Sequence, residues 1–136
     1  MRAYVDASVL LRIILGESEP LAAWPTFVPM SSELIRVECL RVVDRARFGL
    51  GIDDEQTARH RADVLEALGA FRLVPVNTAV LERAAEPFPT ALGSLDAIHL
   101  ATALHLREDV PDLMVATHDR ELATAARSVG FTVKGA

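Results

Sequence analysis

The sequence predicts an α/β fold in three α/β/α layers, with a mostly parallel five-stranded sheet flanked by helices. Short apolar runs alternate along the chain with longer segments of helical periodicity. Continuous apolar strands are typical of sheets covered on both faces, and strand–helix alternation is typical of parallel strands. The chain has 136 residues, of which 51% are hydrophobic, which is enough to bury a core without disulfides or a structural metal. We therefore expect one domain over residues 1–136.

The predicted strands are the short apolar runs of the chain. They lie at Arg2–Val5, Phe27–Met30, Leu73–Val76, Leu113–Ala116 and Phe131–Val133.

Helical patterns separate these runs. One helix begins at Ser31-Ser32 and continues to about Phe48, and Glu33 would complete a capping box at its start. A later helix, Thr78–Glu86, is expected to end at the prolines of "EPFPT". The remaining helical segments are Asp53–Leu68, Ser94–Arg107, where Ser94 is the expected cap, and Asp119–Val129. In open parallel sheets, ligands bind beyond the carboxyl ends of the strands, so polar residues at those ends are candidates for a functional site.

The composition excludes several classes of protein. A net charge of −5 argues against non-specific nucleic-acid binding over the whole surface, and leaves room for a local basic path. The most apolar stretch, Val9–Leu15, is short and broken by Arg12, whereas a membrane span needs roughly 20 apolar residues. Asp6 falls where the apolar region of a signal peptide would lie, so we expect a cytoplasmic protein with no membrane association. Cys39 is the only cysteine, either a core residue or a reactive thiol, which excludes a cysteine-built zinc site.

Two aspartates directly follow predicted strands. Asp6 comes after the first strand, and Asp119, in "LMVATHDREL", comes after the fourth. Because parallel strands end at the same edge of a sheet, both carboxylates are expected at that edge. The alternative is that each aspartate only caps the next helix, since aspartate is a favoured N-cap residue.

Two further acids lie in apolar surroundings. Asp96, in "GSLDAIHLATAL", is in the first turn of a helix that is apolar almost all round, and a buried carboxylate needs a partner or a metal. Glu38 has apolar neighbours one turn away on its helix, and the simplest interpretation is an ion pair with Arg41 at i+3. If the four acids converge, their repulsion requires a cation. An oxygen-only ligand set favours Mg²⁺ or Mn²⁺.

The histidines and glycines add no independent site. The four histidines share no metal-ligand spacing, and the chain has neither a nucleophile elbow nor a glycine-rich phosphate loop. His99, at i+3 from Asp96, either orients that acid or is a satisfied core histidine. His118 adjoins Asp119 and is expected near the same edge of the sheet.

Four motifs stand out along the chain: "YVDASVLLR", "SSELIRVECLR", "LGSLDAIHLATAL" and "VATHDRELATAARSVGF". They resemble the PIN-domain ribonucleases, and most closely the VapC-type toxins of type II toxin–antitoxin pairs. The resemblance extends from residue 1 to about residue 133, and the "LDAIHLATA" segment is its most specific part. It implies a PIN-like domain and metal-dependent hydrolysis of RNA phosphodiester bonds.

The resemblance also implies site residues. The acidic quartet of the family falls on Asp6, Glu38, Asp96 and Asp119, the same four acids that are anomalous on physical grounds. Asp6, Asp96 and Asp119 would hold one Mg²⁺ or Mn²⁺, or two, with Glu38 as a ligand or as the group that positions the water. The remaining matches are Ser8 and Thr117, which are expected to orient the carboxylates without binding the metal themselves. Glu121 is either an outer-shell ligand or a solvated first-turn acid.

The partners implied by the resemblance are RNA, an antitoxin of the VapB type and a second copy of the chain. Single-stranded or looped RNA is the expected substrate, with Arg12 and Arg120 as candidates to hold its backbone. The stretches "VDASVLLRIILGESE" and "ECLRVVDRARFG" either form grooves for an antitoxin helix or are core. Two non-catalytic alternatives remain. One is a receiver-like signalling module, for which Lys134 lies too close to the C-terminus, and the other is a degenerate PIN scaffold.

Overall fold

A computed structural model describes all 136 residues and confirms the predicted fold class. The five strands form one sheet in the order β3-β2-β1-β4-β5, and every neighbouring pair is parallel. The strands are β1 (Arg2–Val5), β2 (Val28–Ser32), β3 (Arg72–Val74), β4 (Met114–Ala116) and β5 (Val133–Lys134).

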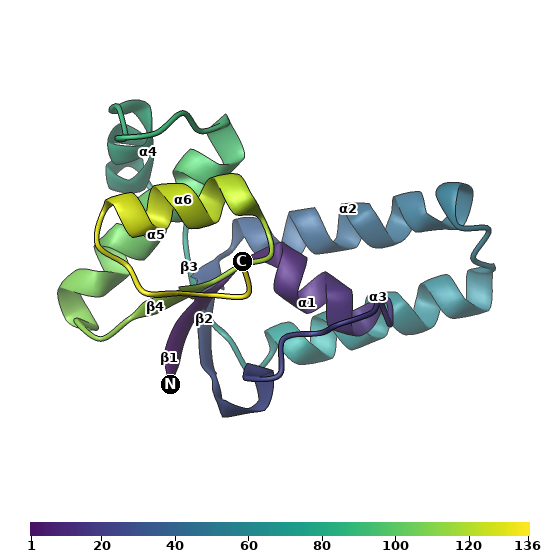
Figure 1. Ribbon diagram of the computed structural model, residues 1–136. Coiled ribbons are helices and arrows are strands. Elements are labelled where there is room, and N and C mark those ends of the chain that lie inside the picture. Colours follow the sequence, from purple (N-terminus) through teal and green to yellow (C-terminus); the bar gives the residue numbers. More distant parts are fainter.

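Helices lie on both sides of this sheet (Figure 1). On one side, α1 packs with α2 and α3, and on the other, α5 packs with α4 and α6. The hairpin of α2 and α3 extends well beyond the sheet (Figure 1). The helices are α1 (Ala7–Ile14), α2 (Leu34–Gly49), α3 (Asp54–Leu68), α4 (Thr78–Ala85), α5 (Ser94–Asp109) and α6 (Arg120–Ser128), with a short 3-10 turn at Trp24–Thr26. None of these helices is long and apolar enough to cross a lipid bilayer.

The predicted start of α2 is wrong by about two residues. Ser31 and Ser32 continue β2, because they pair with Leu73 and Val74 of β3. The hydroxyl of Ser32 then accepts a hydrogen bond from the Leu34 N–H at 3.1 Å. The predicted capping box is also wrong, since Glu33 has helical backbone angles and its side chain makes no capping hydrogen bond.

Of two other helix starts, one differs from the prediction by a residue and one agrees with it. Gly93, not Ser94, is the N-cap residue of α5, and Ser94 is the first helical residue. Asp53 is the N-cap of α3 and accepts a hydrogen bond from the Gln56 N–H at 2.8 Å, which agrees with the expected boundary.

Successive residues of β1 serve opposite faces of the sheet, as the two-residue period of a strand requires. Ala3 and Val5 pack with Val9 of α1, while Tyr4 packs with Leu100 of α5. All five are at most 1% exposed, so β1 is buried on both faces. Cys39 is also fully buried, in the apolar cluster that joins α1, α2 and α3. It is therefore a core residue.

The strand order determines where a site can form. From β1 the chain proceeds to β2 and β3 on one side, and then crosses to β4 and β5 on the other. The order reverses between β1 and β4, and in open α/β sheets the crevice at such a point, beyond the carboxyl ends of the strands, is where ligands bind. Asp6 follows β1 and Asp119 follows β4 after two intervening residues.

Candidate carboxylate site

Asp6 is held at the crevice by its backbone and by two hydroxyl groups. Its N–H donates to the carbonyl of Ala116 at 2.9 Å, which continues the β1–β4 ladder by one residue. Ser8 Oγ and Thr117 Oγ1 both donate to Oδ2 of Asp6, at 2.6 and 2.9 Å. The side chain caps no N–H of α1, so the capping interpretation is wrong for Asp6. Its other oxygen, Oδ1, accepts no hydrogen bond from the protein.

Asp119 does cap a helix. Its Oδ1 accepts hydrogen bonds from the N–H groups of Glu121 and Leu122, at 2.8 and 3.1 Å. The N–H of Asp119 in turn donates to Thr117 Oγ1 at 2.9 Å. Thr117 therefore connects Asp6 to Asp119, which leaves Oδ2 of Asp119 without a hydrogen-bond partner in the protein.

Ser8 and Thr117, the residues expected to orient the carboxylates, both lie beside Asp6. Besides donating to that carboxylate, Ser8 Oγ accepts a hydrogen bond from the N–H of His118 at 2.9 Å. Two donors on one oxygen orient the carboxylate plane. The loop after β4 and the first turn of α1 are thus connected through the Asp6 side chain.

Asp96 is half-buried in the first turn of α5. Burial raises the pKa of its carboxyl group to about 6, and the negative charges of Asp119, Asp6 and Glu38 add to the increase, while His99 acts in the opposite sense. Repulsion from other negative charges favours the neutral form of a carboxyl group.

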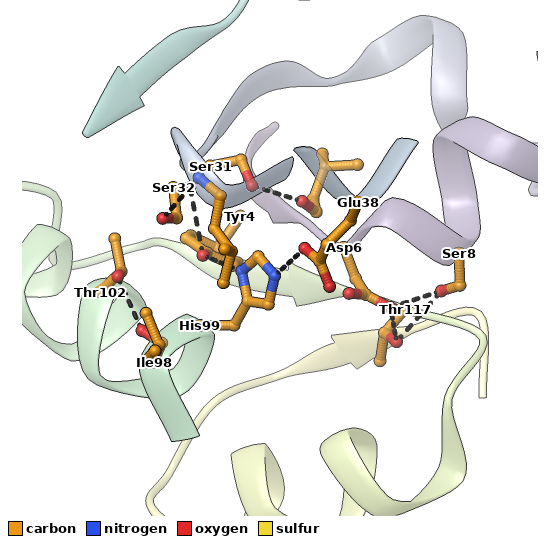
Figure 2. Close-up of polar contacts among 12 residues, drawn as sticks. Tyr4, Asp6, Ser8, Ser31, Ser32, Glu38, Ile98, His99, Thr102 and Thr117 are labelled. Atoms are coloured by element: carbon orange, nitrogen blue, oxygen red, sulfur yellow. Dashed lines mark hydrogen bonds and ion pairs between the residues drawn. The ribbon is translucent and has the colours of Figure 1, made fainter. Parts of the chain in front are cut away.

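Glu38 does not form the expected ion pair with Arg41. Arg41 lies instead 3.8 Å from Asp44. Oε1 of Glu38 makes a very short contact with Nε2 of His99, a fully buried side chain on α5. Nδ1 of His99 is 2.5 Å from the hydroxyl of Tyr4, so the imidazole is hydrogen-bonded at both nitrogens (Figure 2).

The electrostatics of this pair follow from burial and from Glu38. Burial lowers the pKa of His99, but the hydrogen bond and charge of Glu38 outweigh that effect, so that the pKa is raised overall. Burial also raises the pKa of Tyr4 well above its ordinary value. His99 is a satisfied buried histidine, and its side chain contacts Glu38 rather than Asp96. The hydrogen bond between Tyr4 and His99 is a feature of this region that the sequence motifs do not indicate.

The donor chemistry of the crevice fits a hard divalent cation, because every acid contributes carboxylate oxygen. As the side chains stand, no group of three or more His, Cys, Asp or Glu residues is arranged to hold a metal ion. The free Oδ1 of Asp6 and Oδ2 of Asp119 are the atoms available for coordination. Figure 2 shows the two hydrogen-bonded groups that hold the site, with Ser8 and Thr117 directed at Asp6 and His99 directed at Glu38.

The two arginines expected near the crevice differ in position. Arg12, in the last turn of α1, donates to the carbonyl of Glu19 at 3.3 Å and lies near Glu17. Arg120 is exposed at the start of α6 and lines a shallow cavity of about 250 Å³ with Thr90. Of the two, Arg120 adjoins a carboxylate of the crevice. The largest cavity, about 610 Å³ between α4 and α5, is lined by none of the four acids.

Comparison with known proteins identifies the family. A family model described as PIN domain matches residues 3–128. The chain belongs to the PIN-domain family. The match spans all elements from β1 to α6, which includes every acid of the crevice and confirms the resemblance seen in the sequence motifs. Membership in this family also overturns the receiver-like alternative.

Individual relatives and solved structures of other proteins are also similar to this chain. Ribonuclease VapC47 of Mycobacterium tuberculosis (strain CDC 1551 / Oshkosh) is 35% identical, covering 94% of this chain and 92% of the relative. Ribonuclease VapC46 of Mycobacterium tuberculosis (strain ATCC 25618 / H37Rv) is 33% identical, covering 96% and 94%. The fold is shared with VapBC2 from Rickettsia felis bound to a DNA fragment from the promoter, at a TM-score of 0.66 and 7% identity, covering 98% of both chains. It is shared too with a toxin–antitoxin complex from Klebsiella pneumoniae, at a TM-score of 0.58 and 22% identity, covering 89% and 90%.

Proposed function

We propose that this PIN domain is a metal-dependent endoribonuclease and the toxin of a toxin–antitoxin pair. The observation that carries the proposal is the similarity over nearly the full chain to relatives named VapC ribonucleases. The placement of Asp6 and Asp119 at the strand-order reversal supports it from the structure.

In the proposed reaction, Asp6, Asp96 and Asp119 supply the carboxylate oxygens for one Mg²⁺ or Mn²⁺, or two. A divalent cation in such a site polarises a phosphoryl oxygen and makes a water molecule more acidic. Ser8 and Thr117 hold Oδ2 of Asp6, which leaves Oδ1 free for coordination. Oδ1 of Asp119 caps the start of α6, so Oδ2 is the oxygen that would be available to the cation.

Glu38 would either coordinate the cation or orient the water that attacks the phosphorus. One of its oxygens is held by His99, and the second, Oε2, is free for either role. Arg120, exposed beside Asp119, is placed to neutralise a phosphate of the RNA backbone. The proposed substrate is single-stranded or looped RNA, whose bases are accessible to a protein.

The proposed partners follow from the names of the neighbours. Two of them are toxin–antitoxin or VapBC structures, which supports a small antitoxin of the VapB type as the inhibitor of this chain. A homodimer and a cytoplasmic location stay predictions.

The test is cleavage of RNA by the purified chain in Mn²⁺ or Mg²⁺. We expect Asp6→Asn, Asp96→Asn and excess EDTA each to abolish cleavage. Glu66→Gln, on the exposed side of α3, removes one acid outside the crevice and should cleave like the wild type. Cleavage that persists in both aspartate variants and in EDTA would contradict the mechanism, and a fully folded wild type without activity would indicate a degenerate scaffold.

The toxin assignment has a separate test. Expression of the wild-type chain should arrest growth, and co-expression of the small protein encoded immediately upstream should relieve the arrest. Asp6→Asn should be harmless. Growth that continues at high levels of folded wild-type protein would count against the toxin assignment without bearing on the chemistry.

A further inference from the structure

A chain of hydrogen bonds passes through the core and ends at Glu38. The N–H of Ser32 lies 3.2 Å from the hydroxyl of Tyr4, which lies 2.5 Å from Nδ1 of His99. Nε2 of His99 then contacts Oε1 of Glu38. Figure 2 shows the four groups in this sequence, with the imidazole between the phenol and the carboxylate.

The chain is buried along almost its whole length. Ser32 and His99 are 0% exposed and Tyr4 is 1% exposed, whereas the Glu38 side chain keeps 21% of its surface exposed. Tyr4 belongs to the largest apolar cluster, and its ring meets His99 edge-on at 5.8 Å between centroids. An imidazole in such surroundings requires partners for both nitrogens, and here each partner comes from a different element.

Donor and acceptor counting gives the chain a direction. The Ser32 N–H can only donate, so Tyr4 Oη accepts from it and has its own proton to give. The Glu38 carboxylate can only accept, so Nε2 of His99 carries the ring hydrogen and donates it. Nδ1 of a neutral ring is then an acceptor for the proton of Tyr4. A protonated ring also carries hydrogen on Nε2. Glu38 therefore receives the same donor in either state of the imidazole.

The result is a carboxylate whose orientation is set from the core. Oε1 is held by a fully buried ring whose opposite nitrogen is hydrogen-bonded to Tyr4. Oε2 has no hydrogen-bond partner in the protein. The hydroxyl of Tyr4 is thus linked to Glu38 through the imidazole of His99.

We propose that Tyr4 and His99 are positioning residues that select the orientation of Glu38 through the Nε2–H of His99. This inference rests on the proposed function, because it assigns these residues to the same carboxylate site. Groups that hold a ligand from behind typically change metal affinity or activity by roughly 10–100-fold when removed.

The first test needs neither metal nor RNA. Nitrogen-15 NMR of the imidazole in the metal-free wild type should show hydrogen on Nε2. If the ring is neutral, Nδ1 should accept a hydrogen bond. In Tyr4→Phe hydrogen should stay on Nε2, because Glu38 still accepts from it, and the nitrogen-15 shift of Nδ1 should move toward that of a ring nitrogen without a hydrogen-bond donor. Hydrogen on Nδ1 alone in the wild type would overturn the inference.

The second test compares His99→Leu with His99→Gln. Leucine fills the space without a donor, whereas the glutamine amide can accept from Tyr4 and donate to Glu38. We expect His99→Leu to weaken Mn²⁺ binding and to slow RNA cleavage, each roughly 10–100-fold, with substantial recovery in His99→Gln. Val64→Ala, which opens a cavity in the separate α1–α2–α3 cluster, is the control for loss of stability alone and should bind Mn²⁺ like the wild type.

The outcomes separate the two proposals. A wild type that binds no Mn²⁺ and cleaves no RNA overturns the proposed function and with it the role of Glu38. A wild type that does both, with a folded His99→Leu variant equal to it, overturns the positioning role alone.

Discussion

Thr117 Oγ1 donates a hydrogen bond of 2.9 Å to Oδ2 of Asp6, across 111 positions of the sequence. Thr117 is 0% exposed and Asp6 is 6% exposed, so neither group has a solvent alternative. With Ser8 on the same oxygen, this contact leaves Oδ1 of Asp6 without a hydrogen-bond partner in the protein. The relationship makes Thr117 the connection between the ends of β1 and β4.

Thr117→Val should test that connection. Valine preserves the shape of the side chain and removes the donor, so we expect cleavage of RNA to slow roughly 10–100-fold, and Thr117→Ser to retain most of the rate. The measurement is the single-turnover cleavage rate at saturating Mn²⁺. Thr124→Val, which removes an exposed hydroxyl bonded within α6, is the matched control. Equal rates for Thr117→Val and the wild type would mean that Asp6 needs no orientation from β4.

Asp119 serves two purposes that substitution can separate. Asparagine is about as good an N-cap as aspartate, so Asp119→Asn should keep the free energy of unfolding within about 0.5 kcal/mol, whereas Asp119→Ala should lose about 1 kcal/mol. Both variants should lose RNA cleavage, because both lack the charge. Urea denaturation and a cleavage assay measure the two effects. Full activity in Asp119→Asn would show that this residue is a cap and nothing more.

The stability of the metal-free protein should depend on pH through Asp96. Its pKa in the folded chain is raised from 3.8 to about 6, chiefly by burial. The native state thus binds the proton more tightly than the unfolded chain, and this contribution to stability grows as the pH falls through about 6 and is complete below the unfolded pKa. Above about pH 6 the charged form is penalised, and Asp96→Asn removes the penalty.

We therefore expect Asp96→Asn to be more stable than the wild type at about pH 7.5, by about 1 kcal/mol once solvent screening of a half-buried group is allowed for. The advantage should shrink as the pH is lowered to about 5. Thermal unfolding of both proteins in EDTA, as a function of pH, measures the difference. An advantage that is independent of pH would rule out the charge of Asp96 as its cause.

Cys39 should be unreactive in the native protein. Burial raises the pKa of its thiol to about 12, with smaller contributions from the charges of Glu38 and Asp6, and the side chain is 0% exposed. Because the thiolate is the reactive form, alkylation by iodoacetamide should follow the unfolded fraction across a urea titration. Rapid alkylation in native buffer, monitored by mass spectrometry, would restore the reactive-thiol interpretation.

Local patterns in the sequence were sufficient for the fold class and for part of the site. Apolar runs located all five strands to within about three residues, because a strand buried on both faces must be apolar throughout. Asp6 and Asp119 could be assigned to one edge of the sheet for the same reason, since each directly follows or nearly follows such a strand. The start of α2 was misplaced because Ser31 and Ser32 are capping residues by local preference, yet pairing with β3 keeps them in a strand.

The tertiary structure decided which partner each acid has. Glu38 has a basic residue one turn away on its own helix, yet it pairs with His99, 61 positions distant. Asp119 caps its helix and Asp6 does not, although both follow strands. These outcomes depend on which side chains the packing of β1, α2 and α5 brings within hydrogen-bond distance. A partly buried carboxylate needs a hydrogen-bond donor, and the donor can come from any element that packs against it. The spacing of residues along the sequence therefore does not predict which donor this is.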